Sequence, residues 1–370
     1  MKKGVTLYRL FLLLLILVSC KPGSPPLESQ LSKDLDSLIY AVPEFSGVVL
    51  LAENGRPLYH KAFGYRTFQK HEPLDTTSIF ELASVSKQFT AMIIMMLKED
   101  GLLNYDDAIE RYIPGLPYPG ISIRHLLNHT SGLPDYQSLM DQHWDKSKVA
   151  GNIENIEYLK LYHPSEHFIP GEKFEYSNTG YMLLASVAEK VSGKDFIQLC
   201  RERIFQPLQM RQTDIRTKEN KVQLTNTAWG HIYVTEKKEY IHADSFPANN
   251  YCIWLGKRTG PGRVSATASD LLKWDQALYS DKLIKKESLE EAYAPALLND
   301  GTHYPYGFGW QLTEKGNKVF HAGDNPGYKT IIVRLTDQNK TLIMLCNNAH
   351  EKFDYLVKQL EGELVKVNGE

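Results

Sequence analysis

Ser84 and Lys87 are separated by two residues, a spacing at which a serine nucleophile and a lysine base can act together. If residues 85–100 form a helix, the two side chains lie one turn apart on the same face. Ser84 then opens the first turn, where free N–H groups and the positive end of the helix dipole favour developing negative charge. A lysine can take the serine proton if burial or a neighbouring cation lowers its pKa. The spacing therefore predicts a serine that becomes acylated.

A simpler interpretation makes Ser84 a helix cap and Lys87 a solvated side chain, because Ser-x-x-Lys also occurs by chance. The residues that follow, 88–97, are apolar around nearly the whole helix. Such a helix is expected to run through the core. A serine at the start of a buried helix favours the catalytic interpretation.

A second segment of interest is Tyr176-Ser177-Asn178, which follows a turn at residues 170–175 and precedes a predicted helix. In a catalytic site the Tyr176 phenol lies near Ser84 and carries a proton to the leaving group, while the Asn178 amide holds a substrate carbonyl. In the alternative, Ser177 or Asn178 caps the helix and Tyr176 is a packed aromatic residue.

A third segment is His321-Ala322-Gly323, at the end of a predicted strand. Small residues there would allow a substrate to lie against the strand edge. The backbone N–H just after Gly323, that of Asp324, could join the N–H of Ser84 as an oxyanion hole. His321 is expected either to contact a substrate carboxylate or only to pack locally, as most strand histidines do.

His125 and His129 have the i, i+4 spacing of a metal-binding pair. The glutamate of the His-Glu-x-x-His motif is missing and no third ligand is apparent. We therefore predict structural roles for both histidines, with no metal site and no organic cofactor.

Composition indicates a folded domain with an ordinary surface. The chain has 370 residues, of which 42% are hydrophobic and 23% charged, and its net charge is −2. A balanced charge argues against a nucleic-acid partner. Cys200, Cys252 and Cys346 are widely spaced and odd in number, so they are expected to be buried thiols and not a disulfide framework.

The N-terminus predicts export. Lys2, Lys3 and Arg9 precede an apolar run at residues 10–18 that is too short to span a bilayer. The run ends in Leu17-Val18-Ser19-Cys20, which resembles the lipobox of bacterial lipoproteins; an ordinary cleavage site is the alternative. We expect a signal peptide at 1–19, lipidation of Cys20, a tether at 20–28 and a protein anchored to a bacterial membrane.

Residues 29–370 are predicted to form one domain of the α/β (α+β) class. A helix is expected at 29–40 and paired strands at 45–51 and 57–65, around Asn54-Gly55. Further helices are expected at 182–191 and 353–365, and strands at 330–335 and 341–345. Strands at both ends indicate an antiparallel sheet built from both chain ends and flanked by helices, with a mostly helical lobe inserted at about 100–230.

These segments together resemble the penicillin-recognising serine hydrolases, the group that holds class C β-lactamases, D-alanyl-D-alanine carboxypeptidases and esterases of the same fold. The resemblance covers roughly residues 30–350. It is carried by residues 80–87 (FELASVSK), 125–134 (HLLNHTSGLP), 174–181 (FEYSNTGY), 260–271 (GPGRVSATASDL) and 306–310 (YGFGW). It implies a β-lactamase-like fold, Ser84 as nucleophile, Lys87 as base, Tyr176 as second acid/base and Asn178 as a substrate ligand.

One departure bears on the substrate. Many β-lactamases carry Lys-Thr-Gly where this chain has His321-Ala322-Gly323, so a permanent charge and a hydroxyl are absent. The expected function is a peptidase or esterase that acts on cell-wall peptides or small esters through a Ser84 acyl-enzyme. A class C-like β-lactamase is the second expectation, and a penicillin-binding sensor or scaffold with slow turnover is an alternative of another class.

Overall fold

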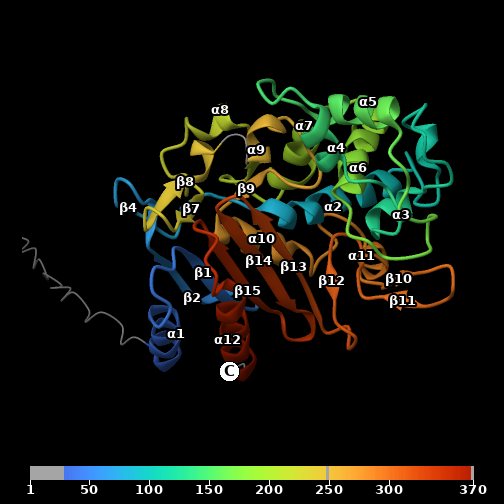
Figure 1. The fold of residues 1–370 in the computed structure, drawn as a ribbon. Helices are drawn as coiled ribbons and strands as arrows, with labels where there is room; N and C mark the ends of the chain where they lie inside the picture. Colours follow the sequence, from blue (N-terminus) through green and yellow to red (C-terminus); the bar gives the residue numbers. More distant parts are fainter. Residues whose placement is uncertain (1–28, 247–249, 368–370) are drawn as a thin grey trace, which may run out of the picture.

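The central element of the computed structural model is a six-stranded antiparallel sheet in the order β12-β13-β14-β15-β1-β2 (Figure 1). The structure describes residues 29–246 and 250–367, so the predicted signal peptide, Cys20 and the tether lie outside it. The bounds of the sheet strands are β1 Gly47–Glu53, β2 Arg56–Phe63, β12 Gln311–Leu312, β13 Lys318–Asn325, β14 Tyr328–Leu335 and β15 Lys340–Cys346.

Strands from the two ends of the chain meet in the middle of this sheet. β1 pairs with β15 from Gly47 opposite Cys346 to Glu53 opposite Lys340. On its other side β1 pairs with β2 through the turn at Asn54-Gly55, where Gly55 has a φ of 73°. The predicted hairpin and the prediction of a sheet built from both chain ends are confirmed.

Each face of the sheet packs against helices because its strands alternate. On β1, Val49 and Leu51 belong to a core shared with α1 (Gln30–Tyr40) and α12 (Phe353–Lys366). Val48 and Leu50 point the other way, into a larger core that includes α2 (Lys87–Glu99) and α10 (Ala268–Ala277). Figure 1 shows α1 and α12 side by side on one face. The sheet therefore forms the middle layer between helices.

Helices occupy much of the chain between the first and last sheet strands. The α-helices there are α3 Ile123–Leu127, α4 Tyr136–His143, α5 Asn152–Tyr162, α6 Asn178–Ser192, α7 Phe196–Cys200, α8 Lys218–Lys221, α9 Tyr251–Trp254 and α11 Lys286–Ala292. Shorter helical turns are η1 Ala83–Ser86, η2 Ile109–Arg111, η3 Arg201–Phe205, η4 Ala243–Ser245 and η5 Thr336–Gln338. In the described part of the chain, none of the helices has the length and apolar composition needed to cross a membrane.

Small sheets lie outside the main one. Their strands are β3 Tyr65–Thr67, β4 Glu72–Pro73, β5 Phe80–Glu81, β6 Asp214–Ile215, β7 His231–Val234, β8 Glu239–His242, β9 Val264–Ala266, β10 Ala296–Leu297 and β11 His303–Tyr304. The sheet β5-β9-β6 matters for the site, because β5 leads directly into the turn that holds Ser84.

The start of the buried helix differs from the sequence expectation. Ser84 lies in the 3-10 turn η1, and the α-helix begins at Lys87. Ala83 has a φ of 49°, in the left-handed region that a non-glycine residue adopts only at a cost. This sharp turn between β5 and α2 sets Ser84 apart from the regular helix. His321 also differs, because it lies in the middle of β13 and not at a strand end.

Candidate active site

Lys87 is the centre of the site. Its side chain is fully buried, and Nζ lies 3.1 Å from Ser84 Oγ, 2.8 Å from Asn178 Oδ1 and 3.0 Å from the carbonyl oxygen of Pro261. A neutral amine has two N–H donors and one lone pair. The two carbonyl oxygens can only accept, so they take the two donors. The lone pair is then left for the Ser84 hydroxyl, as a general base requires.

Two causes lower the pKa of Lys87 well below its ordinary value of 10.5, namely burial and, second, the positive charge of Arg258. Arg258 is itself buried and donates to Tyr136 Oη at 2.7 Å, and it has no carboxylate within salt-bridge distance in the described residues. Its positive charge, which no close ion pair in the described residues offsets, disfavours a second positive charge on Lys87. This role could not be predicted from the sequence, because no residue near Arg258 in the chain indicates that it lies close to Lys87.

Tyr176 lies beside Ser84 with its ring over the amine, whose nitrogen is 4.7 Å from the ring centroid. Although 37% of the Tyr176 surface is open to the cavity, desolvation of the phenol raises its pKa far above 10, and the hydrogen bond with Ser84 offsets only part of this rise. The phenol therefore stays protonated near neutral pH, whereas the lowered pKa of Lys87 favours its neutral, proton-accepting form. Tyr176 is therefore suited to donate a proton and Lys87 to accept one.

Asn178 begins α6, and the structure brings it to Lys87 as well. Ser177 is the N-cap of that helix and accepts from the N–H of Gly180 at 3.1 Å, so the capping interpretation holds for Ser177. A substrate carbonyl can only accept, so Asn178 would hold it through Nδ2 while Oδ1 accepts from Lys87. Asn178 thus orients the base in addition to its predicted role as a substrate ligand.

The two histidines with metal-like spacing make hydrogen bonds typical of structural residues. His125 Nδ1 accepts from the N–H of Ser122 at 3.2 Å, in the capping box of α3. His129 Nδ1 accepts from the N–H of Ser177 at 2.9 Å, and its ring lies 4.3 Å from that of Tyr176. Both contacts support the predicted structural roles, and His129 holds the segment that carries Tyr176.

His321 is buried, with both ring nitrogens bonded inside the protein. Nδ1 lies 2.7 Å from the carbonyl oxygen of Ala322, which can only accept, so Nδ1 carries the proton. Nε2 then accepts from Tyr306 Oη at 2.9 Å. Burial, followed by the nearby Lys87, lowers the pKa of His321 to about 3. Of the two alternatives, the geometry favours local packing over a charged contact with a substrate carboxylate.

This geometry gives a pH prediction. A charged His321 anchor would make KM for a carboxylate-bearing substrate rise with pH as the imidazole lost its proton. Because its pKa lies near 3, His321 is neutral throughout pH 5–8, so we expect no such rise. Steady-state kinetics on a carboxylate-bearing and an uncharged substrate would compare the two KM profiles. A KM that rises with pH for the charged substrate alone would contradict this assignment.

Gly323 brings β13 against the turn that holds Ser84. A Cβ at position 323 would lie 2.3 Å from the carbonyl oxygen of Leu82 and 2.9 Å from Ser84 N, closer than real contacts allow. Glycine is therefore required, because any side chain would push the strand and the turn apart. Asp324, the next residue, lines the same cavity as Ser84, and its N–H remains the predicted second donor of the oxyanion hole.

Ser84 lines a cavity of about 600 Å³ that is also lined by Tyr176, His321, Gly323 and Asp324. β12 pairs only with Val319 and Phe320 of β13, so this short strand leaves the edge of β13 next to His321 and Gly323 uncovered. An extended substrate can add to such an edge through backbone hydrogen bonds. The cavity and the edge together provide space for a peptide or a small ester.

The match to known proteins decides the family. The Beta-lactamase family model matches residues 35–364. The chain belongs to the beta-lactamase family. Its members are serine hydrolases, and this family member is therefore a serine hydrolase too, as the sequence resemblance predicted.

Individual relatives agree with this assignment. Penicillin-binding protein 4* of Bacillus subtilis (strain 168) is 43% identical over 312 residues, which are 83% of this chain and 69% of that protein. D-aminopeptidase of Brucella anthropi is 26% identical over 311 residues, covering 81% of this chain and 56% of the relative. The octameric penicillin-binding protein homologue from Pyrococcus abyssi superposes with a TM-score of 0.78 at 26% identity, over 91% of this chain and 78% of the other.

Proposed function

We propose that this protein cleaves amide or ester bonds through an acyl-enzyme on Ser84. The observation that carries the proposal is the position of Lys87 Nζ, which lies 3.1 Å from Ser84 Oγ and within hydrogen-bond distance of the carbonyl oxygens of Asn178 and Pro261. In its neutral form the amine donates to these two oxygens and keeps its lone pair for Ser84. No other arrangement of a neutral amine satisfies all three neighbours. Lys87 is thus the general base of the proposal.

The proposed reaction has two halves. Lys87 takes the Ser84 proton as Oγ attacks the carbonyl carbon, and the N–H groups of Ser84 and Asp324 stabilise the oxyanion. Tyr176 donates its proton to the departing amine or alkoxide and is reprotonated by the Lys87 ammonium. Water then attacks the acyl-enzyme and gives a proton to the neutral Lys87 amine. The tetrahedral intermediate collapses with Ser84 Oγ as leaving group, Oγ takes that proton back from Lys87, and the acid is released.

A peptidase or esterase is favoured over a β-lactamase by the charges of the cavity. His321 is neutral, and the charged side chains that line the cavity in the described residues are Lys329, Asp324 and Asp354. This set has no excess positive charge to anchor a substrate carboxylate, which a β-lactam brings to the site and which a small ester, or a peptide cleaved at its N-terminal end, does not. The name of the relative D-aminopeptidase supports a peptide as substrate.

A substrate comparison tests the proposal. The purified protein is given a short-chain ester, a D-alanyl-D-alanine peptide and a chromogenic cephalosporin, and kcat/KM is measured for each. We expect turnover of the ester or the peptide to exceed that of the cephalosporin. The reverse order would make the protein a β-lactamase, and a stoichiometric burst without turnover would indicate the penicillin-binding sensor.

We also propose that residues 1–19 are removed and that a lipid on Cys20 anchors the protein through a tether at 20–28. The support is the sequence of the N-terminus, which ends its apolar run in Leu-Val-Ser-Cys. Cys20→Ser is expected to abolish acyl labelling and to move the protein from the membrane fraction to the soluble fraction, because multiple acyl chains anchor stably. Fractionation and mass spectrometry of the mature N-terminus measure this. An unmodified N-terminus in the wild type would rule out the anchor.

A further inference from the structure

We infer that Thr330 and Asn325 are positioning residues that hold the two backbone donors of the oxyanion hole in register with each other. The inference rests on the proposed function, which assigns these donors to Ser84 and Asp324. The two donors come from different elements, the turn η1 and the strand β13. Their separation is therefore not set by local chain geometry and has to be maintained by contacts between the elements.

The turn η1 and the strand β13 meet at Gly323, a residue without a side chain. Gly323 lies so close to Leu82 and Ser84 that a Cβ would not fit. Glycine permits the approach but supplies no force to maintain it. Side chains on either side of Gly323 have to supply that force.

Thr330 holds the contact from the neighbouring strand. It lies directly opposite Gly323 in the register of β13 and β14 and is fully buried. Its hydroxyl donates to the carbonyl oxygen of Leu82 at 2.7 Å. Leu82 precedes Ser84 by two residues, so this bond ties the Ser84 turn to the sheet at the level of the oxyanion hole.

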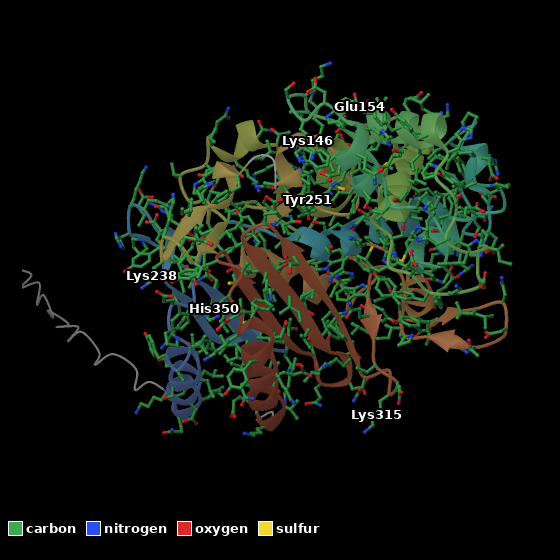
Figure 2. The ribbon with its side chains drawn as sticks, in the orientation of Figure 1. Lys146, Glu154, Lys238, Tyr251, Lys315 and His350 are labelled. Atoms are coloured by element: carbon green, nitrogen blue, oxygen red, sulfur yellow. The ribbon has the colours of Figure 1, made fainter. Side chains whose placement is uncertain are left out.

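Asn325 holds the contact from β13 itself. It follows Asp324 directly, and its Nδ2 donates to Glu81 Oε1 at 2.9 Å, with both side chains buried. Tyr251, labelled in Figure 2, donates its hydroxyl to Asn325 Oδ1 at 2.7 Å and so fixes the orientation of the amide. Glu81 precedes Ser84 by three residues. This second bond therefore joins the chain just after one donor to the chain just before the other.

Glu81 is a strong acceptor because it is ionised. Burial alone would raise the pKa of its carboxyl, but Lys221 and Arg263 outweigh burial and lower the pKa to about 2. Lys221 also forms an ion pair with Glu81. A hydrogen bond to a buried carboxylate is about twice as strong as one between neutral groups. The bond from Asn325 to Glu81 therefore holds β13 strongly against the segment that precedes Ser84.

Loss of either bond is expected to act on the transition state more than on substrate binding. Removing one oxyanion donor outright costs about 10²–10³-fold in kcat. A donor that remains but shifts by a fraction of an ångström loses part of its contribution to kcat. We therefore expect kcat to fall by about 10–100-fold and KM to change by less than about threefold.

Substitution of Thr330 gives a matched test. Thr330→Val keeps the shape of the side chain and removes the hydroxyl, and Leu82 keeps a hydrogen bond from the N–H of Val85 at 3.2 Å. Thr330→Ser retains the hydroxyl and is expected to restore kcat to within about threefold of wild type. Asn325→Ala should lower kcat as Thr330→Val does. Rates are measured on an uncharged ester and divided by the concentration of active sites from covalent titration.

Thr341→Val is the control. Thr341 is a fully buried threonine of β15, in the same sheet, whose hydroxyl donates to Asp275 Oδ2 at 2.8 Å. It does not line the catalytic cavity. This variant is expected to lower the melting temperature and leave kcat per active site unchanged.

Affinity for a boronic acid that forms a tetrahedral adduct on Ser84 gives an independent reading. In Thr330→Val it should fall in proportion to kcat/KM, because the adduct carries the same oxygen that the donors bind. An unchanged kcat per active site in Thr330→Val, or no recovery in Thr330→Ser, would overturn the inference. If the wild type shows no turnover that depends on Ser84, the proposed function fails instead.

Discussion

Ser84→Ala is expected to remove turnover and all covalent labelling by a fluorescent penicillin or a fluorophosphonate, while the protein stays folded. Alanine leaves no atom that can form the acyl bond, and loss of a serine nucleophile costs about 10⁶-fold in kcat in a well-studied serine protease. Ser84 lines the cavity and is only partly buried, so loss of its hydroxyl is expected to leave the core packing intact. Gel fluorescence after labelling and steady-state kinetics measure the effect.

A second serine provides the control for this experiment. Ser288, in α11, is largely buried and donates to Glu99 Oε1 at 2.5 Å, outside the catalytic cavity. Ser288→Ala is expected to keep wild-type labelling. Labelling of Ser84→Ala at the wild-type rate would refute the assignment of the nucleophile.

Lys87→Ala is expected to slow acylation by about 10²–10⁴-fold, the usual contribution of a general base. In the wild type kcat/KM should rise with pH as the neutral amine forms. Because the pKa of Lys87 is lowered well below 10.5, the plateau should be reached at a lower pH than an ordinary lysine would allow. Single-turnover kinetics on an uncharged ester across pH 5–9 measure both the rate and the profile.

The pH profile separates loss of the base from general damage. In Lys87→Ala the rise that depends on this amine should disappear, whereas misfolding would lower the amount of active protein and keep the profile. Lys98→Ala, in the last turn of the same helix and paired with Glu291 away from the cavity, is the matched control and should retain both rate and profile. A profile in Lys87→Ala like that of the wild type would remove Lys87 from the role of base.

The regular elements were the most predictable part of the fold. The Asn54-Gly55 turn, the apolar run after Lys87 and the Gly193 cap each depend on neighbouring residues only. Gly193 has a φ of 68°, which glycine adopts readily, and it caps α6 close to the helix end predicted at residue 191. The 3-10 turn at Ser84 was missed, because the left-handed Ala83 is imposed by the packing of η1 between β9 and β13 and has no local sequence signal.

His321 shows within the site that a role set by tertiary packing cannot be predicted from neighbouring residues. The sequence left two roles for it, and the choice depended on partners that are 15 residues away or in its own strand. Tyr306 and the Ala322 carbonyl occupy both ring nitrogens, and burial then removes the charge. Spacing along the chain cannot reveal such partners, because they are chosen by how the strands and loops pack.

The sequence by itself determined the family and the chemical groups of the site, since Ser84-x-x-Lys87, Tyr176 and His321 lie in segments whose order is characteristic. It also determined the regular elements that carry them. Only the tertiary structure decided how those groups are tuned. The lone pair of Lys87 is directed by Asn178 and Pro261, and its pKa is lowered by burial beside Arg258. Directed hydrogen bonds and desolvation depend on distances between residues far apart in the chain, and those distances exist only once the chain has folded.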